Sequence, residues 1–206
     1  MSRPPPPDRV RTWFPRYAAT VVDVRHGVES VSCPCQRCDP ACYRARGTPF
    51  APVLKDTNPQ DRTVEVMRIL PHDGVVYLCG DYWQIEGSGD ARAQRNVGRF
   101  DPGTGAADND WSPTTDGGVQ DCALLAGVDV MVIAGHYLIV NGAPHQKLAA
   151  VSLRDGSLEP WIESNGTQGV WAVTTTERGE IVLGGNFTRV GAEPAAAFAL
   201  LTHGGG

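Results

Sequence analysis

The chain has 206 residues, a formal net charge of −5 at pH 7 and 41% hydrophobic residues. This composition excludes a disordered chain, which has low hydrophobicity and extreme charge. It also argues against nucleic acid as a partner, because the basic excess of a nucleic-acid binder is missing. No run of about 18 apolar residues occurs, so the sequence predicts no membrane-spanning helix.

The N-terminus is rich in proline, and we expect residues 1–8 to be disordered. The stretch "MSRPPPPDRVRTW" has charged residues and four prolines where a secretory signal would need an apolar run. The sequence by itself therefore leaves the compartment open.

Four of the six cysteines lie in one short run, within an irregular unit predicted over residues 16–53. They are Cys33, Cys35, Cys38 and Cys42. Four thiolates could hold a structural zinc, and one or two disulfides or exposed thiols are the alternatives. We expect the cysteine cluster to be a local crosslink, by metal or disulfide, that stabilises a unit with little apolar core, and not a catalytic centre. The other two, Cys79 and Cys122, are predicted to be buried small hydrophobes.

Three similar stretches follow along the chain: "LCGDYWQIEG" from Leu78, "IAGHYLIVNG" from Ile133 and "LGGNFTRVGA" from Leu183. Their shared glycines are spaced by 55 and 50 residues, at Gly80, Gly135 and Gly185. Glycine, aromatic and β-branched positions that recur at matched phase indicate a repeat architecture. The predicted units span residues 64–113, 119–163 and 170–203.

Each unit is predicted to consist of short strands separated by turns. In the clearest unit the strands are "VQDCALL", "VDVMVIAG", "KLAAVSL" and "LEPWI". Asp73-Gly74 and Asp155-Gly156 predict hairpin turns, because glycine accepts the positive φ that such turns require. No stretch has a convincing 3.6-residue period, so the predicted fold class is all-β with hardly any helix. Four antiparallel strands in about 50 residues is the size of a β-propeller blade.

The segments "GEIVLGGNFTRVGAEP" and "LAAVSLRDGSLEPW" resemble the delta-sixty-type repeat β-propellers. The stretches "VYLCGDYWQIEG", "RFDPGTG" and "WSP" extend the resemblance over residues 64–203. It implies a propeller-like fold in proteins that are mostly uncharacterised, often bacterial or phage-associated and frequently extracellular. It implies no known active site. The sequence departs from the pattern at Cys79 and Ala134, where the first glycine of the family's Gly-Gly pair is missing.

The ends of the chain predict closure of a ring of about four blades. The last unit lacks the strand that carries Trp-x-Pro elsewhere, whereas "RTWFPRY" near the N-terminus has this pattern and "TPFAPV" repeats the theme. We therefore expect residues 9–15 to complete the last blade, with Trp13 packed on the sheet that bears Phe187 and Phe198. An arc of a larger propeller, or a ring completed by self-association with a second copy, are the alternatives. A flexible tail is expected over residues 204–206.

Asp81, His136 and Asn186 occupy matched positions after the shared glycines, at one end of the predicted propeller. They are candidate ligand-binding residues as a polar ring, and the alternative is that each caps its own turn. A second acidic group could bind calcium or cap its own turns. Its members are Asp101, Asp108, Asp110 and Asp116. Catalytic signatures are not found, so the chain is expected not to be an enzyme.

The leading functional hypothesis is a non-catalytic propeller that recognises a protein or glycan surface, outside the cell or on a virion. One alternative is a carbohydrate-active hydrolase or lyase with Asp81 and Glu86 at the propeller mouth. The other is a purely architectural segment of a cell-surface or virion assembly. The first rests on fold analogy and on polar loop ends.

Overall fold

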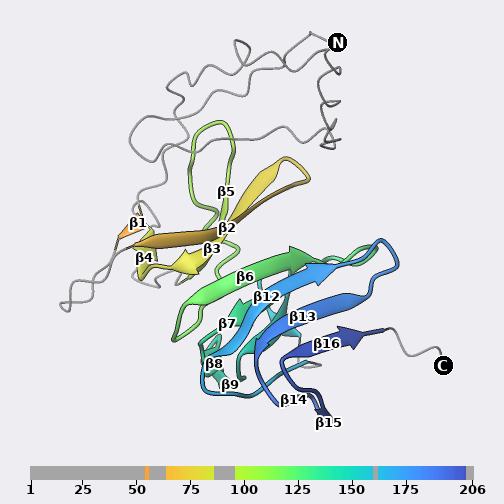
Figure 1. The fold of residues 1–206 in the computed structure, drawn as a ribbon. Coiled ribbons are helices and arrows are strands. Elements are labelled where there is room, and N and C mark those ends of the chain that lie inside the picture. Colours follow the sequence, from red (N-terminus) through yellow and green to blue (C-terminus); the bar gives the residue numbers. More distant parts are fainter. Residues whose placement is uncertain (1–53, 56–63, 86–95, 160–161, 203–206) are drawn as a thin grey trace, which may run out of the picture.

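The computed structural model of the chain describes residues 54–55, 64–85, 96–159 and 162–202. Within these ranges every regular element is a β-strand and no helix occurs. The described strands form three larger antiparallel sheets and three two-stranded ladders (Figure 1). The predicted all-β class is therefore confirmed for this part of the chain.

Several predictions made from the sequence near the two ends of the chain fall on residues outside the described ones. They are the disorder over 1–8, the strand over 9–15, the unit over 16–53 with its cysteine cluster, and the tail over 204–206.

The first sheet has the strand order β2-β3-β5, with β2 at Glu65–His72, β3 at Val75–Asp81 and β5 at Val97–Phe100. Strands β2 and β3 are joined by the predicted hairpin turn at Asp73-Gly74, whose φ angles are 45° and 77°. Glycine adopts this left-handed backbone without a Cβ clash, and aspartate tolerates it better than most residues do.

The middle sheet has the order β11-β10-β7-β6, with β6 at Val119–Leu124, β7 at Val130–Gly135, β10 at Leu148–Ser152 and β11 at Leu158–Glu159. Strands β7 and β10 are buried on both faces. Their sequences "VMVIAG" and "LAAVS" are accordingly apolar without alternation. The predicted turn at Asp155-Gly156 lies between β10 and β11, and Gly156 has a φ of 73°.

The last sheet has the order β12-β13-β16, with β12 at Gly169–Thr175, β13 at Ile181–Asn186 and β16 at Phe198–Leu201. Buried residues alternate with more exposed ones from Ala172 onward in β12 and along β16, as expected of a sheet with one covered face. Val173, Leu183 and Ala199 are buried, whereas Thr174 and Leu200 are exposed.

Short ladders follow the second strand of each sheet. β8 (Ile139–Val140) pairs with β9 (Ala143–Pro144), and β14 (Arg189–Val190) pairs with β15 (Glu193–Pro194). In the first sheet the corresponding strand β4 (Gln84–Ile85) pairs instead with β1 (Leu54–Lys55). These ladders extend each sheet at the end where the candidate polar residues lie.

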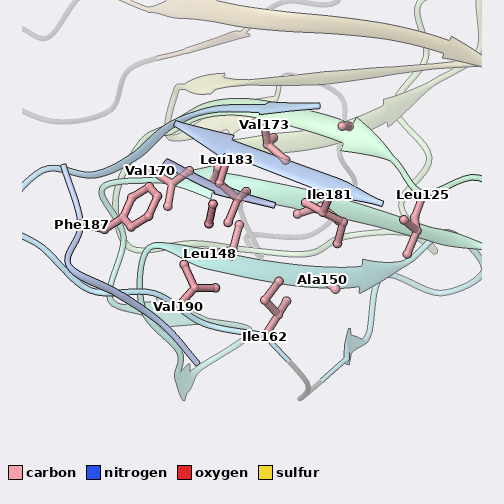
Figure 2. Packing of buried hydrophobic residues seen from close by; sticks show 14 residues of the cluster. Leu125, Leu148, Ala150, Ile162, Val170, Val173, Ile181, Leu183, Phe187 and Val190 are labelled. Carbon is pink, nitrogen blue, oxygen red and sulfur yellow. The ribbon is translucent and has the colours of Figure 1, made fainter. Parts of the chain in front are cut away.

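Apolar clusters join the three sheets in chain order. In Figure 2, Leu148 and Ala150 of the middle sheet lie among side chains that include Val173 and Leu183 of the last sheet. A second cluster joins β3 of the first sheet to the opposite face of the middle sheet, where Ile133 lies. The middle sheet is therefore packed between the other two.

Trp111 is the largest fully buried side chain of the described residues and belongs to the cluster between the first and middle sheets. Its ring meets Tyr77 edge-on, with ring centroids 5.1 Å apart. Its indole N–H donates a hydrogen bond to the carbonyl of Ser152, at 2.8 Å. The guanidinium carbon of Arg99 lies 5.5 Å from the ring centroid, in a cation–π contact.

Candidate functional site

The strand ends that carry the candidate polar residues are shaped by close backbone packing at the shared glycines. A Cβ on Gly80 would lie 2.0 Å from the carbonyl oxygen of Glu65, and one on Gly135 would lie 2.2 Å from that of Gly118. A Cβ on Gly185 would lie 2.5 Å from a backbone oxygen in the same way. Only glycine fits such approaches without displacing the neighbouring strand.

Each of these glycines faces an irregularity in the first strand of its sheet. The register of pairing shifts between Val66 and Arg68 in β2, with matching shifts in β6 and β12. An extra residue at such a bulge bends the strand and re-aims the following side chains. The polar residues that follow the glycines thus lie opposite the bulged end of the neighbouring strand.

Asp81 and His136 are brought close together, although they belong to different sheets. The Asp81 carboxyl group packs against the backbone of Gly118, where an added Cβ would lie 3.2 Å from its carboxyl carbon. Gly118 in turn accepts a hydrogen bond from the backbone N–H of His136, at 3.0 Å. The negative charge of Asp81 acts on the His136 imidazole.

Lys147 is the third residue of this site and was not singled out from the sequence. It is 7% exposed, and its ammonium group donates a hydrogen bond to the backbone carbonyl of His136, at 2.7 Å. Lys147 lies directly before β10 of the middle sheet, with a positive φ of 65°. No sequence pattern marks it, because its burial depends on the packing of Gly169 against its side chain.

The pKa of His136 is lowered from its ordinary value of 6.5. Partial burial is the larger cause and the positive charge of Lys147 the next, while Asp81 acts in the opposite direction. The imidazole is therefore neutral at pH 7 and can both donate and accept hydrogen bonds.

Asn186 does not join this pair. It is exposed at the end of β13, where it pairs with Gly169. Among the described residues, no side-chain hydrogen bond or ion pair links Asn186 to Asp81 or His136. The structure thus brings together two of the three predicted ligand-binding residues.

The turns at this end are capped by residues other than Asp81, His136 and Asn186. One carboxylate oxygen of Asp116 accepts hydrogen bonds from the backbone N–H groups of Leu138 and Ile139, at 2.7 and 2.9 Å. The amide oxygen of Asn165 does the same for Thr188 and Arg189, both at 3.0 Å.

Asp116 and Asn165 lie just before the first strands of the middle and last sheets, 49 positions apart in the sequence. In the first sheet, the side-chain oxygen of Asn96 similarly accepts from the backbone N–H of Tyr82, at 2.9 Å. The signal that could have revealed the shared role of Asp116 and Asn165 is their matched spacing, together with the preference of Asp and Asn for backbone donors.

The ladders share a pattern of buried residues, which we call the buried frame, and differ in their outward side chains. The buried frame has one aromatic residue and one branched aliphatic residue at the ladder of each described sheet. These are Tyr82 and Ile85, Tyr137 and Val140, and Phe187 and Val190. The outward residues form what we call the ladder surface. It comprises Asp81, Trp83, Gln84, His136, Leu138, Ile139, Asn186, Thr188 and Arg189.

The predicted calcium group does not assemble. Asp101 accepts hydrogen bonds from the backbone N–H groups of Gly103 and Thr104, and the Thr104 hydroxyl lowers its pKa most. Asp108 forms an ion pair with Arg99 at 2.6 Å. In the part of the chain that the structure describes, no group of three or more His, Cys, Asp or Glu residues could hold a metal ion.

For the part of the chain that the structure describes, the expectation of a structural zinc held by cysteines is wrong. The described cysteines form a disulfide, and the described residues offer no metal-binding group. Cys33, Cys35, Cys38 and Cys42 lie outside the described residues.

Cys79 and Cys122 are buried as predicted, but they are not free thiols. They form a disulfide between β3 of the first sheet and β6 of the middle sheet, with their Cα atoms 6.6 Å apart. The pairing was missed because the two cysteines are 43 residues apart, and nothing in the sequence shows that their strands face each other.

The described residues contain no helix that is long and apolar enough to span a membrane. Comparisons of the chain with protein-family models, with curated proteins and with solved structures gave no match.

Proposed function

We propose that the three sheets are successive blades of a β-propeller-like repeat array of the delta-sixty type. The bulge in the first strand, the glycine that faces it and the short ladder occur at matched positions in all three. Sheets that stack face to face through apolar clusters in chain order also support this arrangement.

We propose further that this array is a non-catalytic module that recognises a protein or glycan surface. The observation that carries the proposal is the ladder surface, in which a uniform buried frame presents chemically different side chains. Recognition sites typically place variable residues on loops that a rigid scaffold positions. Exposed Leu138 and Ile139 beside His136 supply the mixed apolar and polar character that such surfaces have.

The disulfide between Cys79 and Cys122 supports a place outside reducing compartments, because disulfides persist in oxidising environments. This agrees with the extracellular or virion-associated setting that the resemblance implies.

Binding to a carbohydrate array and to an array of purified surface proteins tests the proposal. We expect the wild-type chain to bind members of one array, and the variant His136→Ala/Leu138→Ala to lose at least tenfold in affinity. The matched control is Val128→Ala/Asp129→Ala, which changes an exposed apolar and an exposed acidic residue at the opposite end of β7. This control should bind like the wild type.

Two outcomes would contradict recognition by this surface. Equal loss in both double variants would show that binding does not depend on the ladder surface. Turnover of a carbohydrate that Asp81→Ala abolishes would favour the hydrolase hypothesis instead.

A further inference from the structure

A hollow of about 420 Å³ lies where the first strands of the three sheets come together. Strand β6 contacts both β2 and β12, and it lies beside β12 in Figure 1. The hollow is lined by Arg68 of β2, Asp121 of β6 and Ala172 of β12. These residues hold matched positions, because each is the first to pair again after the bulge in its strand. None of the described residues that line the hollow belongs to the ladder surface.

One wall of the hollow is apolar. It is formed by Val182, Gly184 and Phe198 of the last sheet, and Phe198 is 64% exposed. A Cβ added to Gly184 would have the Cβ of Ala172 as its nearest neighbour outside the adjoining residues, at 3.9 Å. Packing therefore does not require glycine here, in contrast to Gly185, where an added Cβ would lie 2.5 Å from a backbone oxygen. The missing side chain at Gly184 leaves open space beside Phe198.

The ion pair between Arg68 and Asp121 gives the hollow unused hydrogen-bond donors. The two carboxylate oxygens of Asp121 accept from the backbone N–H groups of Cys122 and Val173, both at 2.9 Å. One of these oxygens also lies 3.4 Å from Nε of Arg68. The Arg68 side chain is 43% exposed, and the N–H groups of its two Nη atoms have no acceptor among the described residues. A ligand in the hollow should therefore supply acceptors to Arg68.

The ligand chemistry that fits these walls is a carboxylate next to an apolar group. A carboxylate accepts two parallel hydrogen bonds from an arginine, and an apolar group would remove the Phe198 surface from water. A hollow of about 420 Å³ is near the lower end of the range typical of ligand sites, about 300–1,000 Å³. A glycan fits less well, because Thr174 is the one hydroxyl-bearing residue among the described residues of the lining.

The apolar surface continues beyond the hollow, and this favours a peptide over a small acid. Leu200 pairs with Val182 across the sheet and is 52% exposed. Leu200 and Phe198 are two positions apart in β16, so their side chains share one face of the sheet. A small acid in the hollow would leave Leu200 in water, whereas an extended segment covers both residues. Adjacent exposed apolar residues and an arginine are also typical of protein interfaces.

We propose that this hollow binds an extended segment of a partner protein. A carboxylate of the segment pairs with Arg68, and a neighbouring aromatic or branched apolar side chain packs against Phe198 beside Gly184. The site is separate from the ladder surface, and binding at one does not require binding at the other.

Selection from a library of random peptides displayed on phage tests the proposal with the full chain as bait. We expect the enriched peptides to carry Asp or Glu within two positions of an aromatic residue or leucine. The most enriched peptide is then synthesised with a fluorescent label, and its affinity is measured by fluorescence anisotropy. Arg68→Gln should weaken binding at least tenfold. Arg178→Gln changes an exposed arginine in the turn between β12 and β13 and should bind like the wild type.

Two further measurements separate loss of the site from loss of the fold. Gly184→Val fills the hollow and leaves the ion pair of Arg68 in place, so it should weaken binding at least tenfold with unchanged stability in urea. Arg68→Glu should abolish binding of the acidic peptide, and a peptide with lysine in place of the acid should bind this variant better than it binds the wild type.

Three outcomes would overturn the proposal. One is a library that yields no enriched peptide. Another is an enriched peptide that lacks an acid, or whose affinity is the same for Arg68→Gln, Gly184→Val and the wild type. The third is a wild-type dimer that Gly184→Val converts to monomer, which would assign the hollow to a second copy of the chain.

Discussion

Single side-chain oxygens hold the short ladders in place. Asp116 binds two backbone N–H groups of the β8 region with one oxygen, and Asn165 does the same for the β14 region. An aspartate and an asparagine thus perform the same task at matched positions. What the turn needs is a side-chain acceptor of the right length, and the negative charge is not required.

We therefore expect Asp116→Ala to lower the free energy of unfolding by about 1–2 kcal/mol, because two donors lose their partner. Asp116→Asn keeps the acceptor and should cost less than about 0.5 kcal/mol. Urea unfolding followed by circular dichroism measures both. Equal destabilisation by the two variants would show that the charge of Asp116 matters more than its oxygen.

The environment of His136 predicts a pH dependence. The folded-state pKa lies below 6.5, so the unfolded chain binds the proton more readily. The contribution of His136 to stability is complete above pH 6.5 and decreases as the pH falls from 6.5 to the folded pKa.

Asp81→Asn removes the charge that raises this pKa, so the pKa should fall further. The histidine resonances in an NMR titration measure the change. Asp129→Asn removes the same charge from an exposed site at the other end of β7 and should leave the His136 titration unchanged. A rise of the His136 pKa in Asp81→Asn would contradict the inferred proximity.

Strands β3 and β6 are joined covalently as well as by packing. A disulfide lowers the conformational entropy of the unfolded chain, and the effect grows with the length of the loop that it closes. The cysteines here are 43 residues apart. Ala134 of the middle sheet holds the position that Cys79 holds in the first sheet. Val173 of the last sheet holds the position that Cys122 holds in the middle sheet.

The variant Cys79→Ala/Cys122→Val thus introduces the residues that other sheets have at the same positions. It should lower the free energy of unfolding by about 2–4 kcal/mol. Urea unfolding with and without reducing agent provides the measurement. Reducing agent should lower the stability of the wild type by more than it lowers the stability of the variant. The pairing would be refuted if the stability of the wild type did not change with reductant and peptide mapping found Cys79 as a free thiol.

The elements differ in how far they could be predicted from the sequence. The hairpin at Asp73-Gly74 and the strands around "VMVIAG" and "LAAVS" were predicted, because turn chemistry and hydrophobic runs are local signals. The buried Lys147 and the disulfide were not, since both depend on which strand faces which. Strand β16 is apolar enough to suggest a core strand, yet Phe198 and Leu200 are exposed.

At the scale of the whole molecule, the middle sheet is the one among the described sheets that packs against a sheet on each face. Its two faces contribute to two separate apolar clusters, one shared with each neighbouring sheet. A substitution on either face should therefore lower the stability of both neighbouring sheets. We expect the described sheets to unfold in one cooperative transition, as single domains usually do.

Leu148→Ala tests this coupling, because Leu148 is 0% exposed and lies in the cluster between the middle and last sheets. Removing its side chain should lower the free energy of unfolding by about 2–5 kcal/mol through lost burial and the cavity left behind. The midpoints from circular dichroism and tryptophan fluorescence should coincide, and amides in β3 and β13 should lose protection from exchange together. Leu138→Ala, at a leucine that is 49% exposed, should change stability by less than about 0.5 kcal/mol. Loss of protection in β13 alone would show that the last sheet unfolds independently of the first.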